Sequence, residues 1–455
     1  MFLFIRDIWN CVRYVYSLYR VYRCETDINA VRVKRAANRC GAIGNKLLQF
    51  LVSTEGFFSS AFKRKFDYVL DRCDNHSFQS TLAMYYDDFA RDLFADFDIC
   101  ASDVNPIGSG TIGQVYKFYY PTLGKHVAVK VKHPGADKQA QRFAASLTRV
   151  MWFIEKFHKL PFASILKEFL INVSLQLDYI VEADNMQRMH NNFKNEHHIV
   201  VPEVYACSSN FIVMSYHEGI SFNDIADNKL RTNVSLDVYL FMLDSIINHD
   251  FLHCDLHVGN WKVGLKPDGS HDFIVYDCGL TSAVGDKDTC KNIVISMLND
   301  DYLELGKIMV PDWKNQALWP ELAEFIKEVV AAPNRTYAER YGDLFKKALS
   351  FGMPLNTYVI RVLQGVLLCL QVINVSRLRL SRVIGNSGNC KEVMLCYNLA
   401  MLRKIGKYPS LTKSFEEWAN EDPNTRRVFE EWLEETFGHK DESVFVDIMI
   451  DGLVI

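Results

Sequence analysis

The chain has 455 residues, of which 49% are hydrophobic and 23% are charged, a composition that excludes disordered and fibrous proteins. Its 51 Lys and Arg residues against 55 Asp and Glu give a formal charge of −4, so we expect no nucleic-acid partner and no global attraction to a membrane. The 12 cysteines contain no C-x-x-C pair, which favours reduced thiols in an intracellular protein over disulfides or structural zinc.

The first 22 residues are rich in aromatic and aliphatic side chains. Arg6, Asp7, Arg13 and Arg20 interrupt them, so no run approaches the roughly 20 apolar residues of a membrane span. The segment also lacks the uninterrupted apolar region of a signal peptide. Three interpretations stay open: an amphipathic helix packed on the domain, a helix on a membrane surface, or a presequence. We therefore expect a soluble or peripheral membrane protein, with lipid contact and organelle targeting left open.

The rest of the chain changes from helical periodicity to strand alternation and back. This order of helices, small sheet and large helical lobe predicts an α+β fold. In chain order, we expect helices over 30–97, an antiparallel hairpin of strands 114–119 and 126–132 with its turn at 121–124, helices over 136–193, a strand pair within 200–215, and mostly helix from 236 onward except around 261–275, with 358–375 as a buried core helix.

A glycine pattern G-x-G-x-x-G spans residues 108–113. By itself it is a weak signal, because dinucleotide-binding loops and ordinary turns share it. A dinucleotide fingerprint opens a helix, whereas this one leads directly into the predicted strand 114–119. That placement is typical of kinases, whose glycine loop lets backbone N–H groups close over phosphates.

The second predicted strand carries Val127-Ala128-Val129-Lys130, close to the V-A-I-K pattern of kinases. In that pattern the lysine contacts the α- and β-phosphates and is held by a glutamate from a following helix. Glu182 is the candidate partner, and spacing alone also allows Glu168. A single strand lysine would otherwise be an ordinary solvated side chain.

The strongest signal is an H-x-D…N pattern, formed by His253, Asp255 and Asn260, with Asp277 seventeen residues after the Asn. Phosphoryl transfer needs a carboxylate that orients or deprotonates the attacking oxygen, and we assign this catalytic role to Asp255. It also needs oxygen ligands for Mg²⁺, which Asn260 and Asp277 supply. The glycine loop, the strand lysine, the helical glutamate, the H-x-D…N pattern and Asp277 thus occur in the order found in kinases.

A competing interpretation makes His253, Cys254 and His257 ligands of a zinc ion. Two neighbouring residues cannot easily face one ion, and no second Cys/His cluster completes a tetrahedron. We therefore favour Mg²⁺ over zinc.

Residues 212–219 are predicted to form a strand that runs into a connector between the lobes. Such a connector presents backbone groups to an adenine ring. The simpler interpretation, a plain strand end, stays open.

These motifs together resemble the UbiB-type atypical kinases, also called aarF-domain kinases. The resemblance rests on residues 106–115, on 127–135 and on 253–260, and it runs from about Asn45 to about Leu280. It implies a two-lobed protein-kinase-like fold with a helical N-terminal extension. In that family a K-x-G-Q motif of the extension folds over the active site, and here Lys46-Leu47-Leu48-Gln49 takes its place, with Leu48 instead of glycine.

Several positions depart from the family pattern. Gly108 and Gly110 replace an alanine-rich loop and free the backbone for closer phosphate approach. The E-x-D motif appears as Gln176-Leu177-Asp178, and alignment on it makes Glu182 the partner of Lys130. Cys278 replaces the usual Phe of D-F-G, and no A-P-E segment follows Asp277, which weakens a peptide-substrate platform.

We therefore expect three domains: a helical extension (1–100) carrying the regulatory Lys46–Gln49 motif, an N-lobe (101–215) and a helical C-lobe (216–455). The expected function is Mg²⁺-dependent ATP binding with transfer or hydrolysis of the γ-phosphate, on an unknown small-molecule or lipid-related acceptor. The alternative is a nucleotide-binding pseudokinase that acts as a scaffold or lipid-binding regulator. The expected nucleotide contacts are Ile107, Gly108, Ser109, Gly110, Thr111, Ile112, Gly113, Val115, Ala128, Lys130, Glu182, Met214 and Tyr216.

Overall fold

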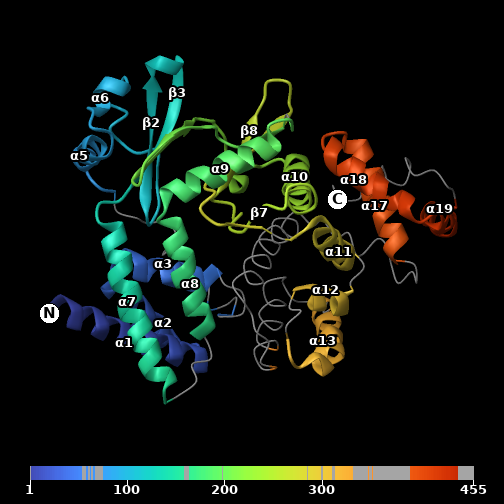
Figure 1. The fold of residues 1–455 in the computed structure, drawn as a ribbon, viewed down its shortest axis with the longest axis horizontal. Helices are drawn as coiled ribbons and strands as arrows, with labels where there is room; N and C mark the ends of the chain where they lie inside the picture. The colour runs from blue at the N-terminus through green and yellow to red at the C-terminus, as the bar shows by residue number, and fades with distance from the viewer. Residues whose placement is uncertain are drawn as a thin grey trace. The chain divides into compact units, whose positions relative to one another are not determined.

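A computed structural model describes most of the chain in two compact units (Figure 1). The first unit contains residues 1–188, 202–216 and 277–280, and the second contains 189–201, 217–276 and 281–455. The buried helix expected over 358–375 lies outside the described residues. The described ranges are 2–53, 58–59, 62, 65–66, 75–157, 163–196, 198–283, 285–298, 301–309, 313–331, 347, 351 and 390–438.

The expected helical N-terminal extension is confirmed. It begins with α1 (Phe2–Arg23), α2 (Asp27–Arg39) and α3 (Gly41–Ser53). Thr26 caps α2 by accepting a hydrogen bond from the Asn29 backbone N–H. Gly41, the first residue of α3, has φ at +74°, a conformation that turns the chain between the two helices. One face of α1 is buried against α2 and α7 (Ala136–Glu155), so the packed amphipathic helix among the three interpretations is present.

A five-stranded antiparallel sheet lies in the first unit, with strand order β1-β2-β3-β6-β5. The predicted hairpin consists of β2 and β3, joined through η2 and Gly124 at φ +63°. The strand pair expected within 200–215 joins the same sheet as β5 and β6. The strands are β1 (Gly108–Ser109), β2 (Gly113–Tyr120), β3 (Lys125–Lys132), β5 (Val204–Cys207) and β6 (Phe211–Ser215), and η2 is Pro121–Leu123.

Alternation along β2 and β3 places one side of the sheet in a hydrophobic core. Tyr116 and Phe118 of β2 pack there with Val129 and Val131 of β3. Helices α5 (Phe78–Phe89) and α6 (Leu93–Asp96) lie beside these strands and contribute to the same core (Figure 1). The other side of β3 is left for the polar residue between the two valines, Lys130.

The remaining helices of the first unit follow the sheet in the sequence. α7 is succeeded by α8 (Ala163–Gln176) and by α9 (Tyr179–Phe193), whose last residues belong to the second unit. α9 carries Glu182 in its first turn.

The second unit is mostly helical, as expected, around α10 (Asn228–Ile247), in which every residue from Asp237 to Ile247 is buried. A small sheet of order β4-β9-β8 and a β7–β10 pair flank the H-x-D…N segment. The elements are β4 (Ile199–Val200), η3 (Phe222–Asp224), β7 (Leu252–His253), β8 (Trp261–Leu265), β9 (His271–Val275), β10 (Thr281–Ser282), α11 (Lys287–Leu298), α12 (Tyr302–Met309), η4 (Gln316–Leu318), α13 (Trp319–Ala331), α17 (Cys390–Ile405), α18 (Pro409–Glu421) and α19 (Asn424–Phe437).

Among the helices of the described ranges, none is both long enough and apolar enough to cross a bilayer. The nine cysteines whose side chains are described are all free thiols.

Gly113 starts β2 at a point where the backbone passes very close to its neighbours. A Cβ atom at this position would lie 2.5 Å from the Val131 carbonyl oxygen and would also collide with the Tyr179 hydroxyl. We therefore expect Gly113→Ala to destabilise the first unit by about 1–3 kcal/mol, the usual cost of overpacking, and to lower the melting temperature by several degrees.

Gly108→Ala is the matched control, because a Cβ there would meet no protein atom within 4 Å. We expect this variant to change the free energy of unfolding by no more than about 0.5 kcal/mol, and so to melt close to the wild-type temperature. Equal melting temperatures for the two variants in calorimetry would show that the close approach at Gly113 is wrong.

Candidate functional site

Lys130 is the centre of a buried cluster of charges in the first unit. Its ammonium nitrogen lies 2.5 Å from a carboxylate oxygen of Glu182 and 3.2 Å from one of Asp277. β3 supplies the lysine, the first turn of α9 supplies Glu182, and Asp277 follows β9 in the sequence. The Glu182 side chain is 1% exposed, the Lys130 side chain 15% and the Asp277 side chain 41%, so the cluster opens toward Asp277.

The charges in this cluster depend on one another. Burial opposes a charge on Lys130, but Asp277 and Glu182 outweigh it and hold the pKa of Lys130 above its ordinary value. Burial likewise opposes a charge on Asp277, but Lys130 and Lys46 hold its pKa below the ordinary value. Burial raises the pKa of Glu182 to about 7 in spite of Lys130. At neutral pH the lysine and Asp277 are therefore both ionised.

Asp277 has an unusual backbone conformation, with φ at +43°. Its carboxylate accepts a hydrogen bond of 3.2 Å from the Gly279 backbone N–H. The next residue, Cys278, is fully buried, and its carbonyl oxygen accepts a hydrogen bond from the Asn185 amide at 3.1 Å. A left-handed non-glycine residue persists only where its surroundings fix it, and these contacts do so. The sequence analysis did not identify Asn185.

Tyr179 was also missed, although it lies in contact with the cluster. The ammonium groups of Lys130 and Lys132 lie 5.2 and 5.1 Å from the centre of its ring. Its hydroxyl is buried and makes no hydrogen bond within the described part of the structure. The available signal was its position three residues before Glu182, which places both on one face of α9.

The glycine loop is the turn between β1 and β2, and it leads directly into β2, as the sequence predicted. The Gly110 N–H donates to the Gly113 carbonyl at 2.8 Å. Packing explains Gly113, but not Gly108 or Gly110: a Cβ at Gly108 would meet nothing within 4 Å, and one at Gly110 would lie 3.8 Å from its nearest neighbour. The space that these two glycines leave suits a ligand whose phosphates approach the backbone.

The N-terminal extension reaches this loop. The Thr111 hydroxyl donates to the Gln49 side-chain oxygen at 3.2 Å. The charge of Lys46, one turn earlier on α3, acts to lower the pKa of both Asp277 and Glu182. The structure therefore brings both residues of the Lys46–Gln49 motif to the loop and the charge cluster.

His133 holds the loop from the other side. Its ring Nε2 lies 2.9 Å from the Gly110 carbonyl oxygen, and its backbone N–H donates to the Ile112 carbonyl at 2.7 Å. His133 follows β3 directly, and its contacts with the loop were not predicted. The K-H-P-G segment after the strand lysine was the signal that could have identified it.

The other expected nucleotide contacts lie on the same sheet. Ile107 is 55% exposed at the start of the loop, and its N–H donates to the Val115 carbonyl at 2.8 Å. Ala128 and Met214 are paired across β3 and β6 and are buried. Tyr216 follows β6, with the Lys117 ammonium 4.2 Å from its ring centre.

The H-x-D…N segment of the second unit forms a loop between β7 and β8. The Asp255 backbone N–H donates to the His253 ring at 3.2 Å. The Asn260 amide donates to the Asp255 carbonyl at 2.8 Å, and it lies 3.4 Å from the Asp255 carboxylate. Tyr276 donates its N–H to the Asn260 carbonyl at 2.8 Å. These contacts fix the backbone of the loop around Asp255, and the Asp255 side chain is 23% exposed.

The same loop does not gather the zinc ligands of the competing interpretation. Cys254 is fully buried, and its thiol donates to the Leu252 carbonyl at 3.5 Å. His257 is half exposed, and its Nδ1 accepts from the Gly259 N–H at 3.0 Å. Across the described residues, no group of three or more His, Cys, Asp or Glu side chains is arranged to hold a metal ion. Asp277 belongs to the first unit and Asn260 to the second.

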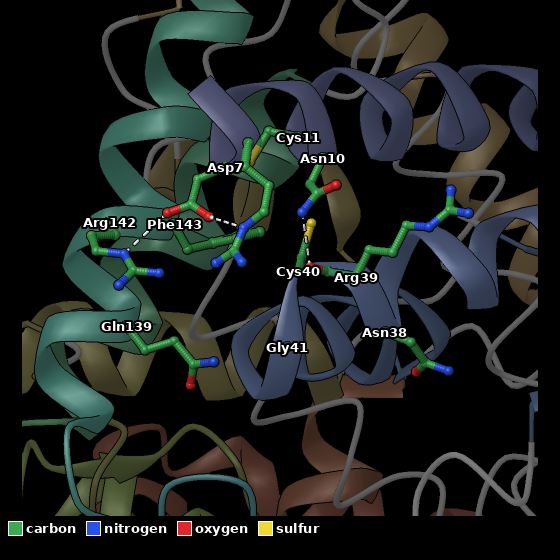
Figure 2. Close-up of a pocket in the computed structure, with 11 residues that line it drawn as sticks. Asp7, Asn10, Cys11, Asn38, Arg39, Cys40, Gly41, Gln139, Arg142 and Phe143 are labelled. Atoms are coloured by element: carbon green, nitrogen blue, oxygen red, sulfur yellow. Dashed lines mark hydrogen bonds and ion pairs between the residues drawn. The ribbon is translucent and has the colours of Figure 1, made fainter. Parts of the chain in front are cut away.

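A cavity of about 150 Å³ lies elsewhere in the first unit, between α1, the end of α2 and α7 (Figure 2). None of the candidate site residues lines it. Its lining residues are Arg6, Asp7, Asn10, Cys11, Asn38, Arg39, Cys40, Gly41, Gln139, Arg142 and Phe143.

Comparisons with known proteins identify the family of this chain. A probable protein kinase UbiB from Actinobacillus pleuropneumoniae is 24% identical over 368 residues, which cover 75% of this chain and 66% of the relative. One from Shewanella putrefaciens is 28% identical over 282 residues, which cover 57% of this chain and 50% of the relative. One from Blochmanniella pennsylvanica is 27% identical over 217 residues, covering 45% and 39%. The chain thus spans between about two fifths and two thirds of the length of these relatives.

A solved structure, that of the Rv3197–erythromycin complex from Mycobacterium tuberculosis, has a TM-score of 0.47 and 18% identity, covering 76% of this chain and 94% of that chain. The model of the ABC1 atypical kinase-like domain matches residues 69–309, which is more than half of the sequence. This match includes the glycine loop, Lys130, Glu182, Asp255, Asn260 and Asp277. The chain therefore belongs to the ABC1 atypical kinase-like family and is of the UbiB type.

Proposed function

We propose that this chain binds Mg-ATP and transfers the γ-phosphoryl group to a small-molecule or lipid-related acceptor, or to water. The observation that carries the proposal is the cluster of Lys130, Glu182 and Asp277, in which Lys130 is paired across the sheet with Val115, just after the glycine loop. A cation held by one buried and one exposed carboxylate is suited to triphosphate oxygens on its open side. The free thiols of the chain support an intracellular setting for this reaction.

The proposed residues have the chemistry that ATP and Mg²⁺ need. Lys130 would bind phosphate oxygens, with Glu182 fixing its position. The Asp277 carboxylate and the Asn260 side-chain oxygen are the hard ligands that Mg²⁺ prefers, and the Asn260 amide nitrogen is already engaged with Asp255. When bound, Mg²⁺ neutralises charge on the phosphates. Gly108 and Gly110 leave space for the backbone of the loop to approach the phosphates.

Asp255 would act on the acceptor. Its backbone is fixed by His253 and by Asn260, so its carboxylate has a defined direction. In the proposed reaction it accepts the proton of the attacking hydroxyl, or orients that hydroxyl, while Lys130 holds the phosphates.

The acceptor is proposed to be small because the sequence after Asp277 carries no A-P-E segment. A second candidate is a nucleotide-binding pseudokinase that acts as a scaffold. The hydrogen bond from Thr111 to Gln49 favours this candidate, because it ties the glycine loop to the chain's own extension. Turnover separates the two functions.

Replacing Lys130 tests nucleotide binding. We expect Lys130→Met to weaken Mg-ATP binding by roughly tenfold to a hundredfold, the worth of about 1.5–3 kcal/mol for a charge-assisted hydrogen bond. Because the pKa of Glu182 is already about 7, this carboxyl can take up a proton when its partner is lost, which limits the cost to stability. Isothermal titration with Mg-ATP measures the change.

Lys125→Ala is the control, since Lys125 lies on the same strand but is exposed. An unchanged Mg-ATP affinity in Lys130→Met, with its melting temperature preserved, would contradict the assignment of Lys130.

Asp255 distinguishes catalysis from scaffolding. We expect Asp255→Asn to keep Mg-ATP affinity while turnover falls by roughly 10² to 10⁴, as for loss of a general base. Asp268→Asn, in the exposed turn between β8 and β9, should leave turnover unchanged. Full turnover in Asp255→Asn would rule out its catalytic role, and ATP binding without turnover in the wild type would identify a pseudokinase.

The extension motif is tested by the double variant Lys46→Ala/Gln49→Ala. Loss of the Thr111–Gln49 hydrogen bond should raise the KM for ATP about twofold to tenfold, the worth of one neutral hydrogen bond. Lys138→Ala, an exposed lysine on α7, is the control in the same steady-state assay. Wild-type kinetics of the double variant for every nucleotide would place the motif outside the working site.

A further inference from the structure

The outward face of α1 carries large apolar side chains that are exposed to solvent. Ile5, Trp9 and Tyr16 are 55–58% exposed, and Tyr19 is about two fifths exposed. The opposite face is anchored: it packs on α2 and α7 through Cys11, Tyr14, Val15, Leu18 and Val21, all of which are buried. The exposure is therefore a property of a firmly packed helix.

The same face is positively charged. Arg6, Arg13, Arg20 and Arg23 are all exposed. Asp7 is the only carboxylate in the sequence of α1, and its side chain is just 16% exposed. Figure 2 shows it turned toward α7, where it accepts from the Arg142 guanidinium at 3.0 Å. The outward surface of the helix thus presents four arginines, of which Arg6 is paired with Asp7 at 3.7 Å.

Aromatic and basic residues alternate along this face. The Arg13 guanidinium lies 5.2 Å from the Trp9 ring centre. The Arg20 guanidinium donates to the Tyr16 hydroxyl at 3.4 Å. Positions 9, 13, 16 and 20 are spaced by four, three and four residues, so they form one stripe along the helix. We call this stripe, with Ile5, Arg6, Tyr19 and Arg23, the α1 outer face.

We propose that the α1 outer face binds the surface of a bilayer that contains anionic lipids, with the helix lying in the interface. Trp and Tyr rings are favoured at the depth of lipid headgroups, because their apolar bodies are buried while their polar atoms stay wet. The arginines complement the lipid phosphates, each adding attraction close to a negatively charged surface. The arginines also prevent deep insertion, so the helix lies on the membrane and does not cross it.

The charge of the whole chain argues that this contact is local. With a formal charge of −4, the protein as a whole is repelled by an anionic surface. Only a face on which positive groups outnumber carboxylates can bind there. This inference is independent of the proposed phosphoryl transfer, since no residue of the charge cluster belongs to the α1 outer face.

Flotation with lipid vesicles tests the proposal on the full-length protein. We expect it to float with vesicles of phosphatidylcholine mixed with phosphatidylglycerol, and to remain unbound with phosphatidylcholine alone. Added salt should weaken the binding, because it screens the arginines.

Two variants assign the binding to the α1 outer face. Each basic residue near an anionic surface is worth about fivefold in binding, so Arg13→Gln/Arg20→Gln should lower the membrane partition coefficient about thirty-fold. The charge-matched control is Arg426→Gln/Arg427→Gln on α19. Trp9→Ser/Tyr16→Ser should also lower the partition coefficient, by at least about tenfold, because this double variant loses two aromatic rings that would lie in the interface. Tyr86→Ala, 63% exposed on α5, is the aromatic control.

All four positions changed in α1 are exposed, so the melting temperatures of these variants should equal that of the wild type. Absence of binding to anionic vesicles would overturn the proposal. It would also be overturned by equal binding to neutral vesicles, by equal losses in the control variants, or by capture of RNA in place of vesicles. ATP turnover without added lipid should be the same in all these variants, which separates this test from that of the proposed function.

Discussion

The Lys130 ammonium group is the point on which the arrangement of the first unit depends. β3 supplies it, whereas its two partners come from α9 and from the segment after β9. A buried cation costs several kcal/mol unless opposite charges surround it, so all three segments must be in place for Lys130 to remain charged. This explains why residues 277–280 group with the first unit although the chain on both sides of them belongs to the second.

The glycine loop is held by residues outside the loop, each at a different atom. Tyr179 lies against Gly113, His133 against the Gly110 carbonyl, and Gln49 against the Thr111 hydroxyl. Because the Gln49 contact comes from α3, the N-terminal extension is structurally part of the site. Gly113 is required by this packing, whereas Gly108 and Gly110 are not.

The departures from the UbiB pattern leave the charge cluster intact. Cys278 is fully buried where a Phe is usual, and its backbone is still held by Asn185. Gln176, which replaces an acidic residue, lies close to Gly279, so one negative charge is missing beside the Asp277 segment. With fewer carboxylates nearby, Asp277 retains Lys130 and Lys46 as its main electrostatic neighbours.

The sequence by itself determined the α+β class, the helical extension, the hairpin and the family, because these follow from local periodicity and from motifs with fixed spacing. It also indicated Glu182 as the partner of Lys130. The tertiary structure alone decided which face of α1 is anchored and which is exposed. It also identified Tyr179, His133 and Asn185, whose importance comes from contacts between segments distant in the sequence. Spacing cannot reveal such contacts, since burial and charge in the folded chain, and not the order of residues, determine what each side chain meets.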